Sequence, residues 1–298
     1  MALRDPARAR GVRAAPMTVL VSIVTPSLNQ AAFLSRAIES VLSQGHPAIE
    51  YIVRDGGSTD GSQEILARYG DRLRWVSEPD GGQSAALNRG FAEARGEILA
   101  YLNSDDLLRP GAVAAVAEHF RRHPECDLLY GDADYLDEDD RIIGAYATEP
   151  YSFARLAEEN IVCQPAAFWR SRLGRRVGPF DEALRYAMDY DYWLRIAQAG
   201  GRIEYLPRTL AASRLHPRAK TVAERPRVLR EIFAVSEARL GRVGRTYFVG
   251  LWHDRLKARR WLGPLRRWRR LYQAMGYLHH QWYHRRRSRR NLEAGTAP

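Results

Sequence analysis

The sequence predicts an α/β fold in which a mostly parallel sheet is covered by helices on both faces. Short apolar runs alternate with segments of helical periodicity from Val19 to Tyr130, and this alternation is typical of such sheets. Polar or acidic clusters follow four of the runs, around Pro26, Asp55, Asp80 and Asp105. Because parallel strands end at the same edge of a sheet, where ligands bind, the clusters predict a site there.

The elements of the first half follow from these patterns. Short runs rich in Val, Ile and Leu predict buried strands at residues 19–24, 49–53, 73–77, 98–102 and 128–130. Apolar residues at helical spacing predict helices at residues 31–44, 63–69, 84–94 and 111–123. We expect Pro26 to end the first strand, because it has no backbone N–H to donate, and Asn29 to cap the helix that follows.

The second half is less regular. Its predicted elements are an acidic hairpin loop at 132–140, helices at 153–159, from 189 onward and at 227–240, a turn at 178–181, and strands leading from 164–169, at 203–206 and at 210–214. No internal repeat is found.

Composition limits the class of protein. Hydrophobic residues make up 45% and charged residues 27% of the 298 residues, as in ordinary soluble globular proteins. Cys126 and Cys163 lie in unrelated contexts, so they form no disulfide framework, indicate no zinc site and suit a reducing compartment. Residues 1–17 are Arg-rich and have no apolar core of a secretory signal, so we expect a disordered arm. No apolar run approaches the ~18 residues of a membrane span.

The net charge of +11 is concentrated at one end of the chain. Residues 241–298 carry 15 Lys and Arg against 2 Asp and Glu, whereas the rest carries 31 against 33. One helical face is predicted there by aromatic and apolar residues, Trp261, Leu265, Trp268, Tyr272, Met275 and Trp282. A basic helix with Trp on its apolar side fits a membrane interface. It also fits a helix packed on the domain with a solvated basic face, or an arm that binds nucleic acid.

The most informative strand end is the stretch from Ile98 to Asp106. An apolar run stops there at Asn103, Ser104 and two adjacent carboxylates, Asp105 and Asp106. Such a pair holds a hard divalent cation through oxygen ligands, or forms a solvated turn or helix cap before the next element. The four polar strand ends favour the cation site over the turn.

With these segments in place, residues 19 to about 240 resemble the family 2 glycosyltransferases, which have the GT-A fold. The matching stretches occur in the family's order, at residues 21–29, 53–61, 80–90, 102–106 and 189–195. Each stretch alone is weakly specific, but five in order are strong. The resemblance implies transfer of a sugar from a nucleotide-diphosphate donor to an acceptor hydroxyl, with inversion at the anomeric carbon. It also implies a domain at 18–240, and the basic helical tail predicted from the charge and apolar spacing follows at 241–298.

The resemblance also assigns residues. It implies donor contacts from the strand-end motifs, at Thr25, Pro26, Asn29, Asp55, Gly81, Gly82, Asn88, Asn103 and Asp105. It implies a divalent cation, Mg²⁺ or Mn²⁺, held by Asp105, Asp106 and His216. Asn103 stands where many relatives have the first Asp of an Asp-x-Asp motif. An alternative interpretation of His216 is a packed or surface histidine without a ligand role.

The family's catalytic base is an acid at the start of a late helix, and that position is Asp189 here. Asp191 is the structural competitor, because two residues apart on a helix the carboxylates point to different faces. Gln164, Trp169 and Asp191 are assigned to the acceptor side, although Trp169 is as easily a core residue. The acceptor is expected to be a saccharide or a lipid-linked molecule of bacterial surface polysaccharide or glycolipid assembly. The tail would then hold a cytoplasmic enzyme on the inner face of the cell membrane.

Three rival functions remain open. An oxidoreductase on the same sheet would need Gly-x-Gly-x-x-Gly directly after the first strand, where the chain has Thr25 to Gln30 instead. A nucleic-acid-binding protein is supported by the tail alone, so no specific nucleic acid is expected. A catalytically inactive relative that binds a nucleotide sugar is kept open by Asn103.

Overall fold

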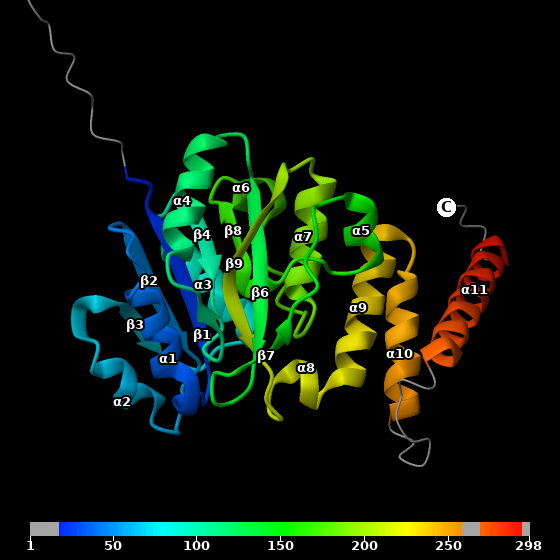
Figure 1. Cartoon of the computed structure of the whole chain (residues 1–298), viewed down its shortest axis with the longest axis horizontal. Helices are drawn as coiled ribbons and strands as arrows, with labels where there is room; N and C mark the ends of the chain where they lie inside the picture. Colours follow the sequence, from blue (N-terminus) through cyan, green and yellow to red (C-terminus); the bar gives the residue numbers. More distant parts are fainter. Residues whose placement is uncertain (1–17, 258–268, 294–298) are drawn as a thin grey trace, which may run out of the picture.

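A nine-stranded sheet forms the centre of the protein in the computed structural model, which describes residues 18–257 and 269–293 (Figure 1). Its strands are β1 Val21–Ser27, β2 Ile49–Asp55, β3 Arg74–Ser77, β4 Ile98–Tyr101, β5 Leu107–Leu108, β6 Leu128–Leu136, β7 Ile142–Ala145, β8 Ala167–Arg170 and β9 Ile203–Arg214. The order across the sheet is β3-β2-β1-β4-β8-β6-β9-β5, with β7 paired to β6. The β3-β2-β1-β4 and β6-β9 pairs are parallel, and β8, β5 and β7 are antiparallel to their neighbours. The predicted mostly parallel α/β sheet is confirmed.

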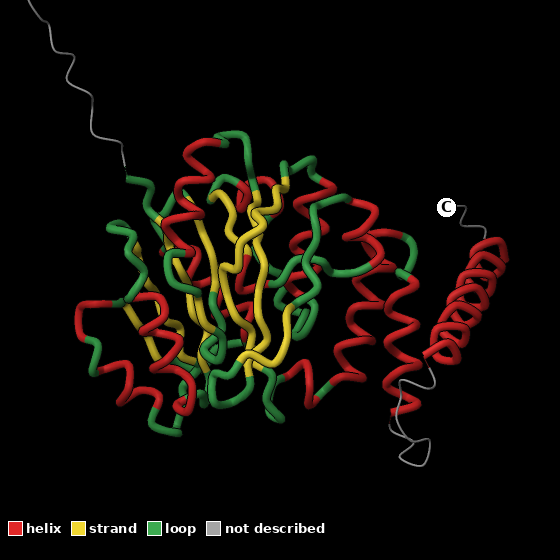
Figure 2. Tube along the Cα trace, in the orientation of Figure 1, coloured by secondary structure: helices red, strands yellow, loops and turns green. Residues whose placement is uncertain are grey.

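Helices cover both faces of this sheet (Figure 2). The α-helices are α1 Ala31–Leu42, α2 Ser62–Ala67, α3 Gln83–Glu93, α4 Ala112–Arg122, α5 Phe153–Glu158, α6 Leu173–Val177, α7 Met188–Gln198, α8 Lys220–Ala223, α9 Arg225–Leu240, α10 Arg245–Lys257 and α11 Arg269–Glu293. Side chains of β1 alternate between two hydrophobic cores, because successive residues of a strand point to opposite faces. Ile23 belongs to the core that also contains buried residues of α1, α2 and α4, while Val24 belongs to the core that contains residues of α3, α7 and α10.

The end of β1 differs from the prediction. Pro26 lies inside the strand and is paired with Arg54 of β2. The side of β1 that faces β4 has no strand partner at Pro26, since that pairing stops at Val24. The missing N–H of proline therefore breaks no ladder hydrogen bond. Asn29 does not cap α1, because Asp60 accepts the N–H of Ala31 instead, at 2.9 Å.

The second half contains longer strands than predicted. Residues 203–206 and 210–214 form one strand, β9, whose register against β6 is irregular around Asp132. The predicted hairpin at 132–140 exists, but β6 continues to Leu136, so the turn itself is shorter. Several short elements were not predicted from the sequence, namely β5, β7, α6 and α8. Runs of two to five residues carry too little periodicity to be recognised.

The basic tail begins as part of the packed domain. Val243 and Phe248 of this region are fully buried, and both belong to the core that contains α7. Gly244 lies so close to Glu158 that a Cβ atom would approach the carbonyl oxygen of Glu158 to 2.1 Å. The predicted boundary at residue 240 thus falls inside packed structure.

The last helix, α11, packs beside α10 (Figure 1). Gly276 provides the close approach, since a Cβ there would meet Cα of Val249 at 2.7 Å. Of the predicted apolar face, Trp261, Leu265 and Trp268 lie outside the described residues. Trp282 is 53% exposed rather than buried. None of the helices in the described part of the chain is long and apolar enough to cross a bilayer.

Replacing Phe248 with Ala tests whether α10 is part of the domain. We expect the free energy of unfolding to fall by about 3–5 kcal/mol, because a large aromatic side chain is removed from a closed core. Leu278→Ala, at a side chain that is 65% exposed, is the control and should change stability by less than about 0.5 kcal/mol. Urea unfolding of the full chain measures both. An unchanged main transition for Phe248→Ala would show that α10 unfolds separately.

Candidate active site

The predicted polar clusters do meet at one end of the sheet. β1, β2, β3 and β4 are parallel neighbours, so the loops that follow them share one edge. The amino-terminal end of α3 lies beside the end of β4, since Gln83 Nε2 donates to Asn103 Oδ1 at 2.7 Å. The start of α7 joins them, because Ser84 Oγ lies 2.9 Å from Sδ of Met188.

Asp55, at the end of β2, is buried and fixes the turn that follows. Its carboxylate accepts hydrogen bonds from the N–H and Oγ of Ser58 at 2.8 and 2.5 Å. It also accepts from the N–H of Gly57 at 3.2 Å and from Oγ of Ser77 at 2.6 Å. The contact between Asp55 and the donor that the resemblance implies would therefore come on top of four hydrogen bonds, and it stays a prediction.

The end of β1 lines the same loops. Oγ1 of Thr25 lies 3.0 Å from the buried hydroxyl of Tyr51, so its side chain faces the core and its backbone is what remains for a ligand. Asn29 has a positive φ of 53° and binds the turn after β2. Its Oδ1 accepts the N–H of Thr59 at 2.9 Å, and its own N–H donates to Ser58 at 2.7 Å. Pro26 and Asn29 are thus placed beside Asp55.

The Gly81-Gly82 pair forms the entry to α3. The N–H of Gly82 donates to Asp80 at 2.7 Å, and its φ of 112° is one that glycine adopts without strain. Asn88, further along α3, is structural. Both ends of its side-chain amide bind the backbone of Phe180, at 2.9 Å each. These bonds hold α3 against the turn at 180–182, and a contact between Asn88 and the donor stays a prediction.

Asn103 is the centre of a side-chain network at the end of β4. Besides the bond from Gln83, its Nδ2 donates to Gln164 at 3.1 Å and to Asp106 at 3.2 Å. Nε2 of Gln164 donates in turn to the carbonyl oxygen of Tyr101 at 2.7 Å. The amide thus accepts from one neighbour while donating to two, which a carboxylate at position 103 could not do.

Asp105 and His216 form the pair best placed to hold a cation. Oδ2 of Asp105 and Nε2 of His216 are 3.1 Å apart, and the histidine is 3% exposed and packs on Phe33. Carboxylate and imidazole together suit a divalent ion such as Mn²⁺. Phosphate oxygens of a substrate commonly complete such a site. The donor set of this pair therefore fits the cation that the resemblance implies.

Asp106 does not join this pair. Its oxygens accept from the N–H of Arg214 at 2.9 Å and from Asn103. Among the described residues, the three predicted metal ligands do not bring their ligand atoms within 4.8 Å of one another. Burial, with the neighbouring charge of Asp105, raises the pKa of Asp106 to about 7. Asp106 is thus a supporting residue of the loop rather than a third ligand.

Asp189 lies in the first turn of α7 and is partly buried. Burial raises the pKa of Asp189 to about 6, against the lowering effect of its hydrogen bonds. One of these comes from Nδ2 of Asn160 at 3.5 Å. A carboxylate with a pKa near neutrality is suited to accept a proton during a reaction.

The segment from Asn160 to Gln164 joins this carboxylate to the network of Asn103. One end of the segment binds Asp189 and the other binds Asn103. Four residues of extended chain span at most about 14 Å. The charges of Asp189 and Asp106 both raise the pKa of the buried Cys163 thiol, after the larger effect of burial. The two carboxylates therefore face the same small region.

Two acceptor predictions are corrected. Oδ2 and Oδ1 of Asp191, which is 2% exposed, bind Arg195 at 2.8 Å and Arg239 at 2.7 Å. Trp169 is 1% exposed and pairs with Leu99, near the amino-terminal end of β4. Asp191 thus links α7 to α9, and Trp169 is a core residue at the far end of the strand. Gln164 remains at the site, bound to Asn103.

Residues that the sequence analysis missed complete the site. Glu231 of α9 accepts the N–H groups of Tyr186 and Ala187, at 2.6 and 2.7 Å, just before α7. Lys220 donates to Gln83 at 2.9 Å and lines a pocket of about 90 Å³ at the start of α3. Burial lowers the pKa of Lys220, while Asp105 raises it. Lys220 follows the predicted metal ligand His216 by only four residues, and this short separation in the sequence could have indicated that Lys220 lies at the site.

Comparison with known proteins agrees with this architecture. A profile described as Glycosyl transferase family 2 matches residues 22–169. A PGL/p-HBAD biosynthesis glycosyltransferase of Mycobacterium bovis is 34% identical over 187 residues, which is 61% of this chain and 70% of the relative. An uncharacterised glycosyltransferase of Nostoc sp. is 30% identical over 66% of this chain. The chain spans 65% of that relative, and 64% of a similar one from Rickettsia typhi.

Solved structures show the same fold. Residues 1–349 of S. aureus TarS, in complex with UDP-GlcNAc, superpose with a TM-score of 0.60 at 18% identity, over 72% of this chain and 65% of that one. The mannosyltransferase PcManGT from Pyrobaculum calidifontis, in complex with GDP-Man and Mn²⁺, gives 0.58 at 20% identity, over 89% and 71%. From the sequence identity to the mycobacterial relative and the shared architecture, we conclude that this chain belongs to glycosyl transferase family 2 and has the GT-A fold.

Proposed function

We propose that this protein is an inverting glycosyltransferase that moves a sugar from a nucleotide-diphosphate donor to an acceptor hydroxyl. Convergence of the Asp105–His216 pair and Asp189 at one end of the sheet is the observation that carries this proposal. The solved structures of TarS and PcManGT are complexes with nucleotide sugars, which supports the same class of donor here. Inversion needs a single base on the face opposite the leaving group, and Asp189 is the candidate.

The donor side has to accommodate a leaving diphosphate. A divalent cation held by Asp105 and His216 would neutralise the charge that develops as the glycosidic bond breaks. Lys220, close enough to Asp105 to feel its charge, supplies a second positive group beside the start of α3. The backbone at Gly81 and Gly82 allows close approach of the donor, because neither residue carries a side chain.

The acceptor side has to remove a proton from a hydroxyl group. Asp189 accepts this proton as the hydroxyl oxygen attacks the anomeric carbon, an effect worth typically 10²–10⁴-fold in rate. Asn160 orients the carboxylate, and Glu231 holds the backbone that leads into it.

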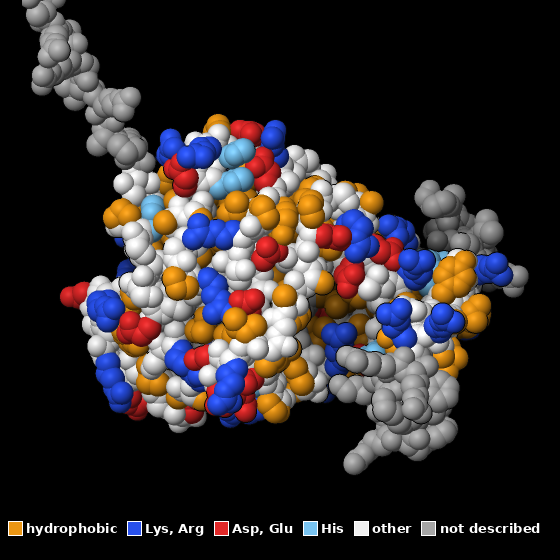
Figure 3. All heavy atoms as spheres, in the orientation of Figure 1, with side chains coloured by type: hydrophobic (Ala, Val, Ile, Leu, Met, Phe, Trp, Pro, Cys, Tyr) orange, Lys and Arg blue, Asp and Glu red, His pale blue; other side chains and the backbone are white. Residues whose placement is uncertain are grey.

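The acceptor's chemistry is indicated by α11. Its outer face exposes four large apolar side chains, Leu271, Tyr277, Leu278 and Trp282. Arg285 and Arg286 flank them, and the Arg286 guanidinium lies 5.2 Å from the Trp282 ring centroid. Figure 3 shows hydrophobic side chains beside Lys and Arg at this end of the molecule. We infer that this face rests on an anionic leaflet at the inner side of the cell membrane, near a saccharide or lipid-linked acceptor.

We expect the donor to bind only in the presence of a divalent metal ion, and Asp189→Asn to lose turnover. We expect one of a panel of nucleotide sugars to bind with Mg²⁺ or Mn²⁺ and to be released by EDTA. Donor hydrolysis or transfer should fall about 10²–10⁴-fold in Asp189→Asn, with donor affinity retained. Isothermal titration and product chromatography measure the two quantities.

Asp191→Asn is the matched control for this experiment. It removes a charge from the same helix turn, so we expect a lower melting temperature, because Arg195 and Arg239 lose a buried partner. Turnover per folded molecule should remain. Donor binding without any turnover in the wild type would favour the inactive relative, and no binding at all would contradict the transferase.

The pH dependence of kcat tests the base separately. Asp189 must be ionised to accept a proton, so kcat should rise as the pH is raised through about 6. Asn160→Ala removes a hydrogen bond that favours the ionised form, so the rise should move to higher pH. Glu231→Gln removes a negative charge that raises the pKa of Asp189, so the rise should move to lower pH. Stopped assays at saturating donor and metal measure the profiles, and a rise that neither variant moves would exclude Asp189.

Vesicle binding tests the role of α11. We expect the protein to co-sediment with vesicles containing phosphatidylglycerol, and less so at high salt. Leu278→Ser with Trp282→Ser should abolish most of this binding, while Ile142→Ser with Ile143→Ser removes two comparably exposed side chains of β7 and should not. Substitution is preferable to truncation at Gly241, which would remove Phe248 from the core. Unchanged vesicle binding in the α11 variant, or binding to oligonucleotides instead, would contradict the membrane assignment.

A further inference from the structure

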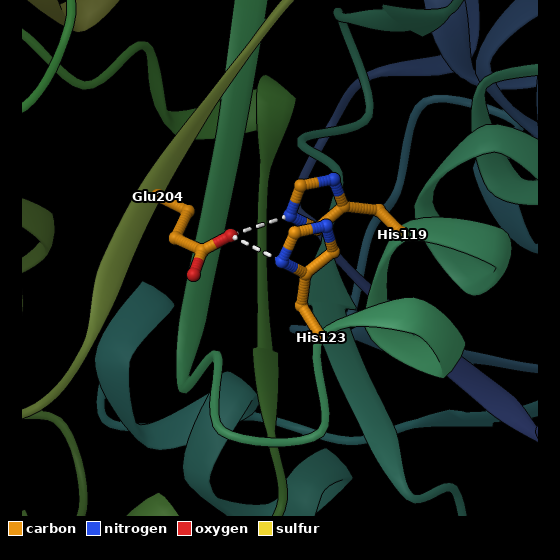
Figure 4. A group of neighbouring side chains, drawn as sticks. All are labelled: His119, His123 and Glu204. Atoms are coloured by element: carbon orange, nitrogen blue, oxygen red, sulfur yellow. Dashed lines mark hydrogen bonds and ion pairs between the residues drawn. The ribbon is translucent and has the colours of Figure 1, made fainter.

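Two histidines and a glutamate converge at the other end of the sheet, where α4 ends and β9 begins (Figure 4). His119 Nε2 and His123 Nδ1 lie 2.8 and 3.3 Å from the same oxygen, Oε2 of Glu204. The side chains of His119 and Glu204 are 15% and 17% exposed, and that of His123 is 40% exposed. These three ligand atoms lie within 4.8 Å of one another.

The helix presents both imidazoles to one point. His119 and His123 are four residues apart, so they lie on the same face at the end of α4. Their rings are stacked, with centroids 4.2 Å apart and planes 8° from parallel. Each ring turns one nitrogen toward Glu204 (Figure 4). Two imidazoles and a carboxylate on one point are the ligand set of many zinc sites.

The second carboxylate oxygen of Glu204 is held by a neighbouring arginine. Arg202 Nε donates to Oε1 at 2.8 Å, which leaves Oε2 to face the histidines. The carboxylate is therefore fixed in orientation by Arg202, as an outer partner fixes metal ligands elsewhere.

We propose that His119, His123 and Glu204 bind one divalent transition-metal ion of the Zn²⁺ type, which fastens α4 to β9. Zinc bonds of about 2.0–2.2 Å in a tetrahedron place ligand atoms about 3.4 Å apart. The two observed separations, 2.8 and 3.3 Å, would have to open by about 0.6 and about 0.1 Å to reach this value. Water, or Glu125 with Oε1 at 3.9 Å from His123 Nδ1, is available as the fourth ligand.

This site is distinct from the candidate active site. Glu204 is the second residue of β9, and Arg214, whose backbone binds Asp106, is the last. Ten residues of strand separate them by roughly 30 Å. The ion would thus take no part in transfer and would act on stability. The cysteines gave no sign of a zinc site, because the ligands are histidines on a helix and a glutamate 81 residues further on.

Zinc affinity of the full chain tests the proposal. We would titrate wild-type protein with Zn²⁺ alone against a chelating dye, and compare His119→Gln with His123→Gln as a double variant. Affinity at the tightest site should fall more than about 100-fold, since loss of an outer partner alone costs 10–100-fold. Co²⁺ should give the intense visible absorption of a tetrahedral site in the wild type and lose it in the double variant. Co²⁺ bound by Asp105 and His216, with water as the remaining ligands, would instead give the weak absorption of an octahedral site.

A second histidine pair supplies the matched control. His280 and His284 also lie four residues apart on a helix, with ring centroids at 4.5 Å. Changing both to Gln should leave the tightest zinc site and the Co²⁺ spectrum unchanged. Far-UV circular dichroism confirms folding, and Glu204→Gln repeats the test with the helix intact. Equal zinc affinity in wild type and the His119/His123 variant, or loss of the site in the His280/His284 variant, would overturn the proposal.

Discussion

A buried arginine holds the candidate active site together. The side chain of Arg214, at the end of β9, is fully buried, and a buried cation is stable only where partners surround it. It donates to the carbonyl oxygens of Asp105 and Asp137, at 2.9 and 2.6 Å, and pairs with Asp140. Its guanidinium also lies 5.0 Å from the ring of Phe33 on α1. The loop after β4, the turn after β6 and the first helix are therefore fixed by one side chain.

The part of this architecture that the sequence predicts is its local part. In the first half, apolar residues recur with the period of a strand or of a helix, so this periodicity alone locates the elements. The positions of the strand ends then follow from the positions of the strands. What sequence reasoning misses depends on distant partners. Asn88 looks like a ligand contact in its motif, but its amide binds Phe180, 92 residues away. Pro26 is tolerated in β1 because β4 stops short of it, and no local pattern contains that information.

The two acids of α7 show how position decides chemistry. Asp189 and Asp191 are the same type of residue, and both lie in the first turn of α7. Asp191 forms ion pairs with Arg195 of its own helix and with Arg239 of α9. Asp189 faces the site with an amide as its neighbour, and its pKa is raised to about 6 by burial. Both oxygens of Asp191 are bound by arginines, so of the two carboxylates only that of Asp189 is presented to the site.

Helix α10 of the basic tail is connected through Asn160 to Asp189, the proposed base. The hydroxyl oxygen of Tyr247, on α10, accepts the backbone N–H of Asn160 at 2.9 Å, and Asn160 in turn donates to Asp189. Outside α10, helix α11 packs on Phe248 through the rings of His279 and Tyr283. Helix α11, which we propose rests on a membrane, is thus two contacts away from the segment that binds Asp189. Helices α10 and α11 are therefore packed on the domain by contacts that adjoin those holding Asn160.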